Sequence, residues 1–81
     1  LEIDCLIKKY ASHWSLERIT NIDRNILRIA IYEIVFLSNI PKSVSINEAV
    51  ELAKKYSTDS SFGFVNGVLG KVKEKELDPQ I

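Results

Sequence analysis

The stretch TNIDRNILRIAIYEIVFL, residues 20–37, decides the fold. Its apolar side chains, at about 100° per residue, cover most of a helix circumference and leave a narrow polar strip. That strip holds Arg24, Asn25, Arg28 and Tyr32. Thr20, with an acidic residue three positions later at Asp23, forms a capping-box-like helix start. The stretch therefore predicts a central helix that is buried on nearly all sides.

The N-terminal side of the chain predicts one amphipathic helix over residues 1–11. Its apolar residues follow the i, i+3, i+4, i+7 spacing, and they are Ile3, Leu6, Ile7 and Tyr10. A polar connection follows and holds one short helical turn at residues 15–19. The single cysteine, Cys5, lies among the apolar residues of the first helix, so we expect a reduced, buried thiol.

A third helix is predicted after Pro41, because proline disfavours helical geometry in the residue before it and so ends the central segment. Ser45 and Glu48 form an S-x-x-E capping box, which predicts a helix that runs from there to about Tyr56. The inward face of this helix is predicted to hold Ile46, Ala49, Val50 and Ala53.

The last helix is predicted over about residues 61–75, with Asp59 or Ser60 as its cap. Its predicted inward face consists of Phe62, Val65, Val68, Leu69 and Val72. The opposite face holds Gly63, Gly67 and Gly70. Each glycine inside a helix costs ~1 kcal/mol of helix stability relative to alanine. Three of them on one face therefore predict a bare backbone that another helix or chain can approach closely. Phe64, Lys71 and Lys75 form a strip at the border between the two faces.

These patterns predict one all-α domain over residues 1–81, a compact helical bundle of about four main helices plus the short turn. Eleven basic and eleven acidic residues balance, which argues against binding nucleic acid by bulk charge alone. No apolar run approaches the ~18 residues of a membrane span, and no secretory signal is visible, so we expect a cytoplasmic protein. The chain starts in helical register without methionine, which predicts a fragment of a longer chain.

The sequence offers binding chemistry and no catalytic group in a recognisable arrangement. Glu33 lies within an apolar stripe, so we predict that it accepts hydrogen bonds from a loop or helix start around residues 42–47, or meets an arginine. His13 lacks metal-ligating neighbours. The glycine stretch 63–71 is not a phosphate loop, because Val72 stands where serine or threonine is needed. We expect a non-enzymatic binding domain without metal or cofactor.

Three stretches together closely resemble the C-terminal half of the NusB family of bacterial transcription antitermination factors. They are NIDRNILRIAIYEI (21–34), IPKSVSINEAVELAKKY (40–56) and FGFVNGVLGKV (62–72). The resemblance implies an all-helical fold of two subdomains, of which this chain supplies one. It also implies binding of boxA RNA in nascent ribosomal RNA transcripts together with the ribosomal protein NusE. The pair would join the RNA polymerase antitermination complex, with no enzymatic activity and no cofactor.

The resemblance also assigns roles to individual positions. It places Glu17 and Arg18 along the RNA, Ser60 and Phe64 at the surface facing RNA and partner, and Asp23 toward NusE. Lys71 joins the RNA-binding set because an aromatic ring beside a lysine suits a stacked base next to a phosphate. Packing of Phe64 against a neighbouring helix is an equally open alternative.

Two further readings stay open. The chain resembles, less directly, the NusB-like RNA-recognition domain attached to ribosomal RNA cytosine methyltransferases, and the residues alone support a purely protein-binding bundle. The family's arginine-rich N-terminal segment is absent here, so we expect weak RNA binding by the chain alone. Missing half of the family's fold should expose apolar surface, which makes self-association possible.

Overall fold

The structure is a computed structural model, and it describes residues 2–11, 19–58 and 61–76. The described chain forms α1 (Glu2–Tyr10), α2 (Asn21–Phe36), α3 (Lys42–Tyr56) and α4 (Ser61–Glu76). The predicted all-α class and the four helices are therefore confirmed. Residues 15–18 of the predicted helical turn lie outside the described residues, as do both candidate caps of the last helix and the His13 position.

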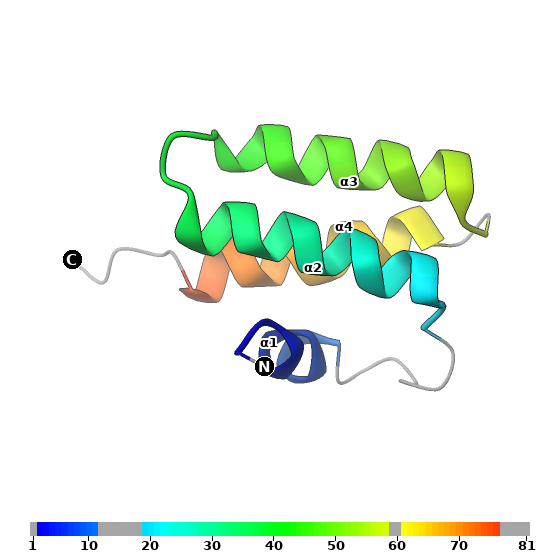
Figure 1. Cartoon of the computed structure of the whole chain (residues 1–81), viewed down its shortest axis with the longest axis horizontal. Coiled ribbons are helices and arrows are strands. Elements are labelled where there is room, and N and C mark those ends of the chain that lie inside the picture. Colours follow the sequence, from blue (N-terminus) through cyan, green and yellow to red (C-terminus); the bar gives the residue numbers. More distant parts are fainter. Residues whose placement is uncertain (1, 12–18, 59–60, 77–81) are drawn as a thin grey trace.

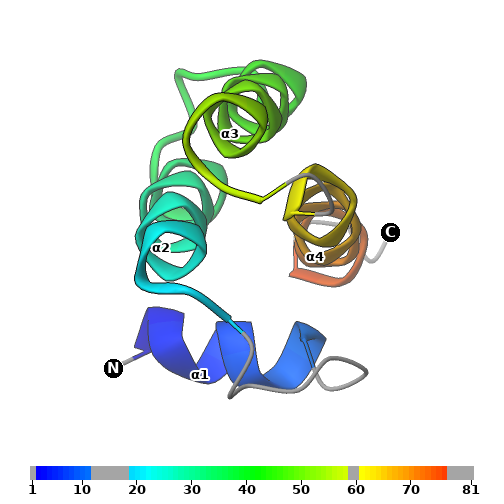
Figure 2. The ribbon, with the colours of Figure 1, turned by 90° about the vertical axis from the view of Figure 1, so that its right-hand side faces the viewer.

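Helices α2 and α4 lie at the middle of the described bundle. Each of them contacts the other three helices. Figure 2 looks along α2, α3 and α4 nearly end-on, while α1 is seen from its side, crossing beneath α2 and α4. The largest fully buried apolar side chains come from α2 and α4, and they are Leu27, Ile31, Ile34, Val65, Val68, Leu69 and Val72. Burial of each stabilises the fold by about 1.5–3 kcal/mol.

The start of α2 confirms the predicted cap. The backbone N–H of Asp23 donates to Thr20 Oγ1 at 3.1 Å, which satisfies one of the free N–H groups at the helix start. The predicted burial on nearly all sides is wrong. Ile22, Ile29 and Phe36 are 45%, 59% and 50% exposed. They lie seven residues apart and so share one outward stripe, because the other three helices cover only one side of α2 in the described chain.

Helix α3 starts one turn earlier than the capping-box pattern indicates. Its N-cap is Pro41, whose carbonyl accepts from the N–H groups of Val44 and Ser45 at 3.0 and 3.3 Å. Ser45 is therefore not a cap. It lies inside the first turns, is 1% exposed, and donates to Glu33 Oε1 at 2.8 Å. This bond confirms the predicted partner of Glu33, while the capping role predicted for Ser45 and Glu48 is wrong.

Helix α1 is held in the bundle by a buried apolar contact and by an exposed ion pair to α2. Ile7 and Tyr10 are buried in the core, whereas Cys5 lies off that face and is exposed. The prediction of a buried thiol is therefore wrong. On the exposed side, Arg28 donates to both carboxylate oxygens of Asp4, at 2.9 and 3.0 Å. These hydrogen bonds from Arg28 lower the pKa of Asp4 from 3.8 to about 2.

Helix α4 spans the predicted residues, but its two phenylalanines exchange places. Phe64 is 6% exposed and belongs to the core, whereas Phe62 is 43% exposed. The buried arc runs through residues 61, 64, 65, 68, 69 and 72, with spacings of three and four that leave position 62 at its edge. The predictions that Phe62 packs inward and that Phe64 stands at the border are both wrong.

This exchange predicts different costs for two nearby truncations. Phe64→Ala should lower the free energy of unfolding by about 3–5 kcal/mol, the usual cost of emptying a buried aromatic site. Phe62→Ala should cost about 1 kcal/mol or less, because its ring is half exposed. Urea denaturation followed by circular dichroism measures both. Phe64→Leu serves if the alanine variant does not fold. Equal costs for the two positions would contradict the assigned burial.

The Asp4–Arg28 pair predicts a pH dependence. A carboxyl whose pKa is depressed in the folded state contributes stability above its unfolded value of 3.8, and loses it as the pH falls through about 2. We expect the difference in stability between the wild-type chain and Arg28→Gln to vanish over that interval. Thermal denaturation at several pH values measures it. A difference that persists unchanged at pH 2 would contradict the assignment to this pair.

Candidate binding surface

The residues predicted to bind RNA or partner do not gather on one exposed strip in the described chain. Asp23 and Phe64 are buried, and Lys71 is exposed on α4. The other three, Glu17, Arg18 and Ser60, lie outside the described residues. The border strip that would join Phe64 to Lys71 is therefore absent, because Phe64 turns into the core.

Asp23 instead anchors a buried polar cluster where α2 and α4 begin. Its Oδ2 accepts from Ser61 Oγ at 2.8 Å, across 38 positions of sequence. Ser61 Oγ also lies 2.9 Å from Ser57 Oγ and 2.8 Å from Thr58 Oγ1. A serine hydroxyl has one proton and two acceptor sites. Because Ser61 uses its proton on the carboxylate, Ser57 and Thr58 must donate to it, and the hydroxyl is then saturated.

One atom of this cluster lacks a donor. Asp23 Oδ1 is buried and accepts no hydrogen bond from the described residues, although the residue as a whole is only 4% exposed. A buried carboxylate oxygen without a donor is costly and needs an explanation in a native fold. Among the described residues, Ser61 therefore holds Asp23 in place through Oδ2 alone.

Lysines and exposed aromatic rings surround the same end of the bundle. The ammonium of Lys54 on α3 lies 5.3 Å from the centre of the Phe62 ring on α4. The ammonium of Lys55 lies at the same distance from the ring of Tyr56, which is 57% exposed. We call these four residues the α3–α4 rim. A signal for the rim was present in the sequence as Lys-Lys-Tyr, but the stacking pattern was assigned to Phe64 and Lys71 instead.

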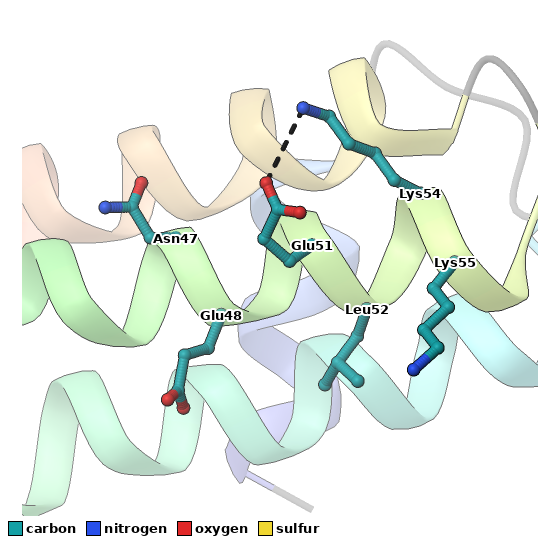
Figure 3. Close-up of a pocket in the computed structure, with 6 residues that line it drawn as sticks. All are labelled: Asn47, Glu48, Glu51, Leu52, Lys54 and Lys55. Atoms are coloured by element: carbon teal, nitrogen blue, oxygen red, sulfur yellow. Dashed lines mark ion pairs between the residues drawn. The ribbon is translucent and has the colours of Figure 1, made fainter.

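The outer side of α3 carries an open hollow next to this rim. It is lined by Asn47, Glu48, Glu51, Leu52, Lys54 and Lys55. Figure 3 shows that Lys54 and Glu51 lie on the side of α3 toward α4, joined by an ion pair, while Lys55, Leu52 and Glu48 lie on the side toward α2. The hollow is a shallow, mixed-charge surface, so it suits a macromolecular contact better than an enclosed small molecule.

The glycine face of α4 is confirmed as exposed. A Cβ added at Gly63, Gly67 or Gly70 would meet no atom within 4 Å, and none of the three has a positive φ. Nothing in the described chain makes the close approach that the glycines predict, so that approach stays a prediction for a partner. The described residues contain no group of three or more metal-ligating side chains, and none of their helices is long and apolar enough to cross a membrane.

The described residues form a small all-helical domain with hydroxyls, lysines and exposed rings at one end. The sequence pattern of the NusB family matches residues 1–74, and the chain belongs to that family. This confirms the resemblance found in the sequence.

Individual relatives agree with this assignment. The "Transcription antitermination protein NusB" of Thermodesulfovibrio yellowstonii is 53% identical over 75 residues, covering 93% of this chain and 50% of the relative. The protein of the same name from Bacillus licheniformis is 51% identical over 72 residues, covering 89% and 56%. A solved structure of T. maritima NusB matches with a TM-score of 0.83 at 47% identity, over 91% of this chain and 52% of that one. The chain thus spans about half the length of these relatives.

The polar cluster predicts an unusual cost for one buried serine. Ser61→Ala removes the donor to Asp23 and the acceptor shared by two hydroxyls, so we expect a loss of about 1.5–3 kcal/mol in the free energy of unfolding. Ser43→Ala, on the exposed side of α3, is the matched control and should change stability by no more than about 0.5 kcal/mol. Urea denaturation measures both. Equal, small effects would contradict the cluster.

Proposed function

We propose that this chain is the RNA- and protein-binding part of a transcription antitermination factor. It binds boxA-type RNA of nascent ribosomal RNA transcripts together with the ribosomal protein NusE, and the pair joins the RNA polymerase antitermination complex to suppress termination. The observation that carries the proposal is the family match over residues 1–74, with relatives of about 50% identity that bear the antitermination name.

The polar cluster supports a protein partner at the end of the bundle where α2 begins. Asp23 was assigned to the NusE side by resemblance, and its Oδ1 is a buried acceptor that lacks a donor in the described chain. A partner that binds at this end of the bundle would contact the exposed side chains around Asp23, because Oδ1 itself is sealed from the surface. In this proposal Phe64 contributes indirectly: its buried ring fixes the first turns of α4, from which Ser61 reaches Asp23.

The charge balance supports joint rather than independent RNA binding. Equal numbers of acidic and basic residues give a net charge of zero, so the chain lacks the excess of positive charge that drives binding to phosphates. Lys71 on α4 supplies one exposed ammonium for a phosphate. Arg18 and Glu17 are assigned to the RNA by resemblance, as is Ser60. A basic ribosomal partner would supply the remaining charge.

The proposal predicts that RNA binding depends on both RNA sequence and partner. Fluorescence anisotropy with a labelled boxA-type RNA and a scrambled RNA, with and without NusE, measures it. We expect the chain with NusE to bind the boxA-type RNA at least about ten-fold more tightly than the scrambled RNA, a difference of ~1.4 kcal/mol. The chain alone should bind weakly.

Two outcomes would contradict this function. Equal affinity for the two RNAs would remove the boxA specificity. The affinity for boxA-type RNA should also rise when NusE is added. If it does not change, after correction for RNA binding by NusE itself, a site formed jointly by the two proteins is contradicted.

A further inference from the structure

We propose that the α3–α4 rim is a contact for an unpaired stretch of RNA, in which Phe62 and Tyr56 stack on bases while Lys54 and Lys55 bind the adjacent phosphates. This inference rests on the proposed function and adds to it a surface that the resemblance did not assign. RNA is the occupant that fits the chemistry of the four side chains, two aromatic rings and two ammonium groups.

The Lys54–Phe62 pair is the centre of the rim. The two residues come from different helices, so the fold itself brings the ammonium to 5.3 Å from the ring centre. Phe62 is 43% exposed, which is unusual for phenylalanine and leaves much of the ring available to another aromatic system. Base stacking on an exposed ring beside a cation is how single-stranded nucleic acids are commonly bound, because every base presents a flat aromatic face.

Lys55 and Tyr56 extend the same arrangement around the end of α3. Tyr56 is the last residue of the helix and is 57% exposed, and the ammonium of Lys55 lies 5.3 Å from its ring centre. A phosphate that draws either ammonium away from its ring would leave the ring face free for the neighbouring base. The ring thus binds the base and the ammonium binds the phosphate of one nucleotide. An apolar protein segment has no phosphate for the ammonium to bind.

Glu51 is the acidic side chain paired with this surface. Its Oε2 lies 3.6 Å from Lys54 Nζ, and its side chain is 73% exposed. Asp23 is buried and hydrogen-bonded to Ser61, and Glu48 lies on the side of α3 toward α2, away from Lys54. Glu51 therefore competes with a phosphate for Lys54, so its removal should favour RNA.

The chain contains a matched control for the rim. The tripeptide Lys-Lys-Tyr occurs twice, at residues 8–10 and at residues 54–56, each time at the end of a helix. The ammonium of Lys9 lies 5.1 Å from the ring centre of Tyr10, much as in the rim. Tyr10 is only 8% exposed, so its ring is committed to the core. Removing the lysines at the two places changes the net charge equally, while only one place offers an exposed ring.

The first experiment compares these two places. Binding of the boxA-type RNA to the whole chain with NusE is titrated at several salt concentrations for Lys54→Ala/Lys55→Ala and for Lys8→Ala/Lys9→Ala. We expect the first variant to bind several-fold more weakly and to lose about 1.4 from the slope of log affinity against log salt, at about 0.7 for each phosphate contact. The second should behave like the wild-type chain, and Glu51→Gln should bind more tightly.

The second experiment separates stacking from simple apolar contact. Phe62→Ala and Tyr56→Ala should each weaken binding about ten-fold, the loss of one stacked base. Phe62→Leu keeps an apolar side chain but no aromatic face, so it should bind as weakly as Phe62→Ala, whereas Phe62→Trp should keep the wild-type affinity. Helical content and thermal stability of each variant, measured by circular dichroism, identify any loss caused by unfolding.

The outcomes distinguish this inference from the proposed function. If the wild-type chain with NusE binds boxA-type RNA while the rim variants bind as well as it does, the rim inference is wrong and the function stands. If Phe62→Leu retains RNA affinity, or if the rim variants lose affinity for NusE and not for RNA, the surface is a protein contact and the inference is again wrong. If the wild-type chain binds no RNA with NusE, both are overturned.

Discussion

The hydrogen bond from Ser61 to Asp23 fixes the geometry on which the candidate surface depends. It joins the start of α2 to the start of α4 across 38 positions of sequence, and it does so with a buried carboxylate. One oxygen of that carboxylate is satisfied because the serine hydroxyl donates to it, and the neighbouring hydroxyls of Ser57 and Thr58 then saturate the serine. The first turn of α4 is thereby held in one orientation, with Phe64 inward and Phe62 outward beside Lys54.

A second surface of the molecule has a different character. The outward stripe of α2 consists of Ile22, Ile29 and Phe36, and the ring centres of Phe36 and Tyr32 lie 5.5 Å apart. Figure 1 shows α2 between α3 and α1, and the three side chains of the stripe are about half exposed. A row of exposed apolar side chains favours contact with protein rather than with a polyanion. The two surfaces therefore suit different partners, and self-association through the α2 stripe stays a prediction.

Local patterns in the sequence predicted the helices and several of their polar contacts. The cap of α2 followed from Thr20 and Asp23, and the partner of Glu33 followed from the cost of burying a lone carboxylate. The start of α3 was mispredicted because the chain is already helical from Lys42, so Ser45 lies inside the helix and donates to Glu33 instead of capping.

The candidate site was harder to predict than the fold. A helical wheel gives directions around one helix, but the edge of its buried arc depends on how the neighbouring helices sit. That edge decides which of Phe62 and Phe64 is buried, and hence which of the two rings lies exposed beside a lysine. The Asp23 cluster likewise depends on a tertiary contact that no local pattern contains.

The most direct test of the proposed RNA surface is a map of amide chemical shifts of the isotope-labelled chain with NusE as boxA-type RNA is added. We expect shifts concentrated at residues 54–58 and 61–64, together with shifts at Lys71 and at the positions assigned to RNA by resemblance. Shifts confined to α1 or to the α2 stripe, with the α3–α4 end unchanged, would contradict the proposed surface.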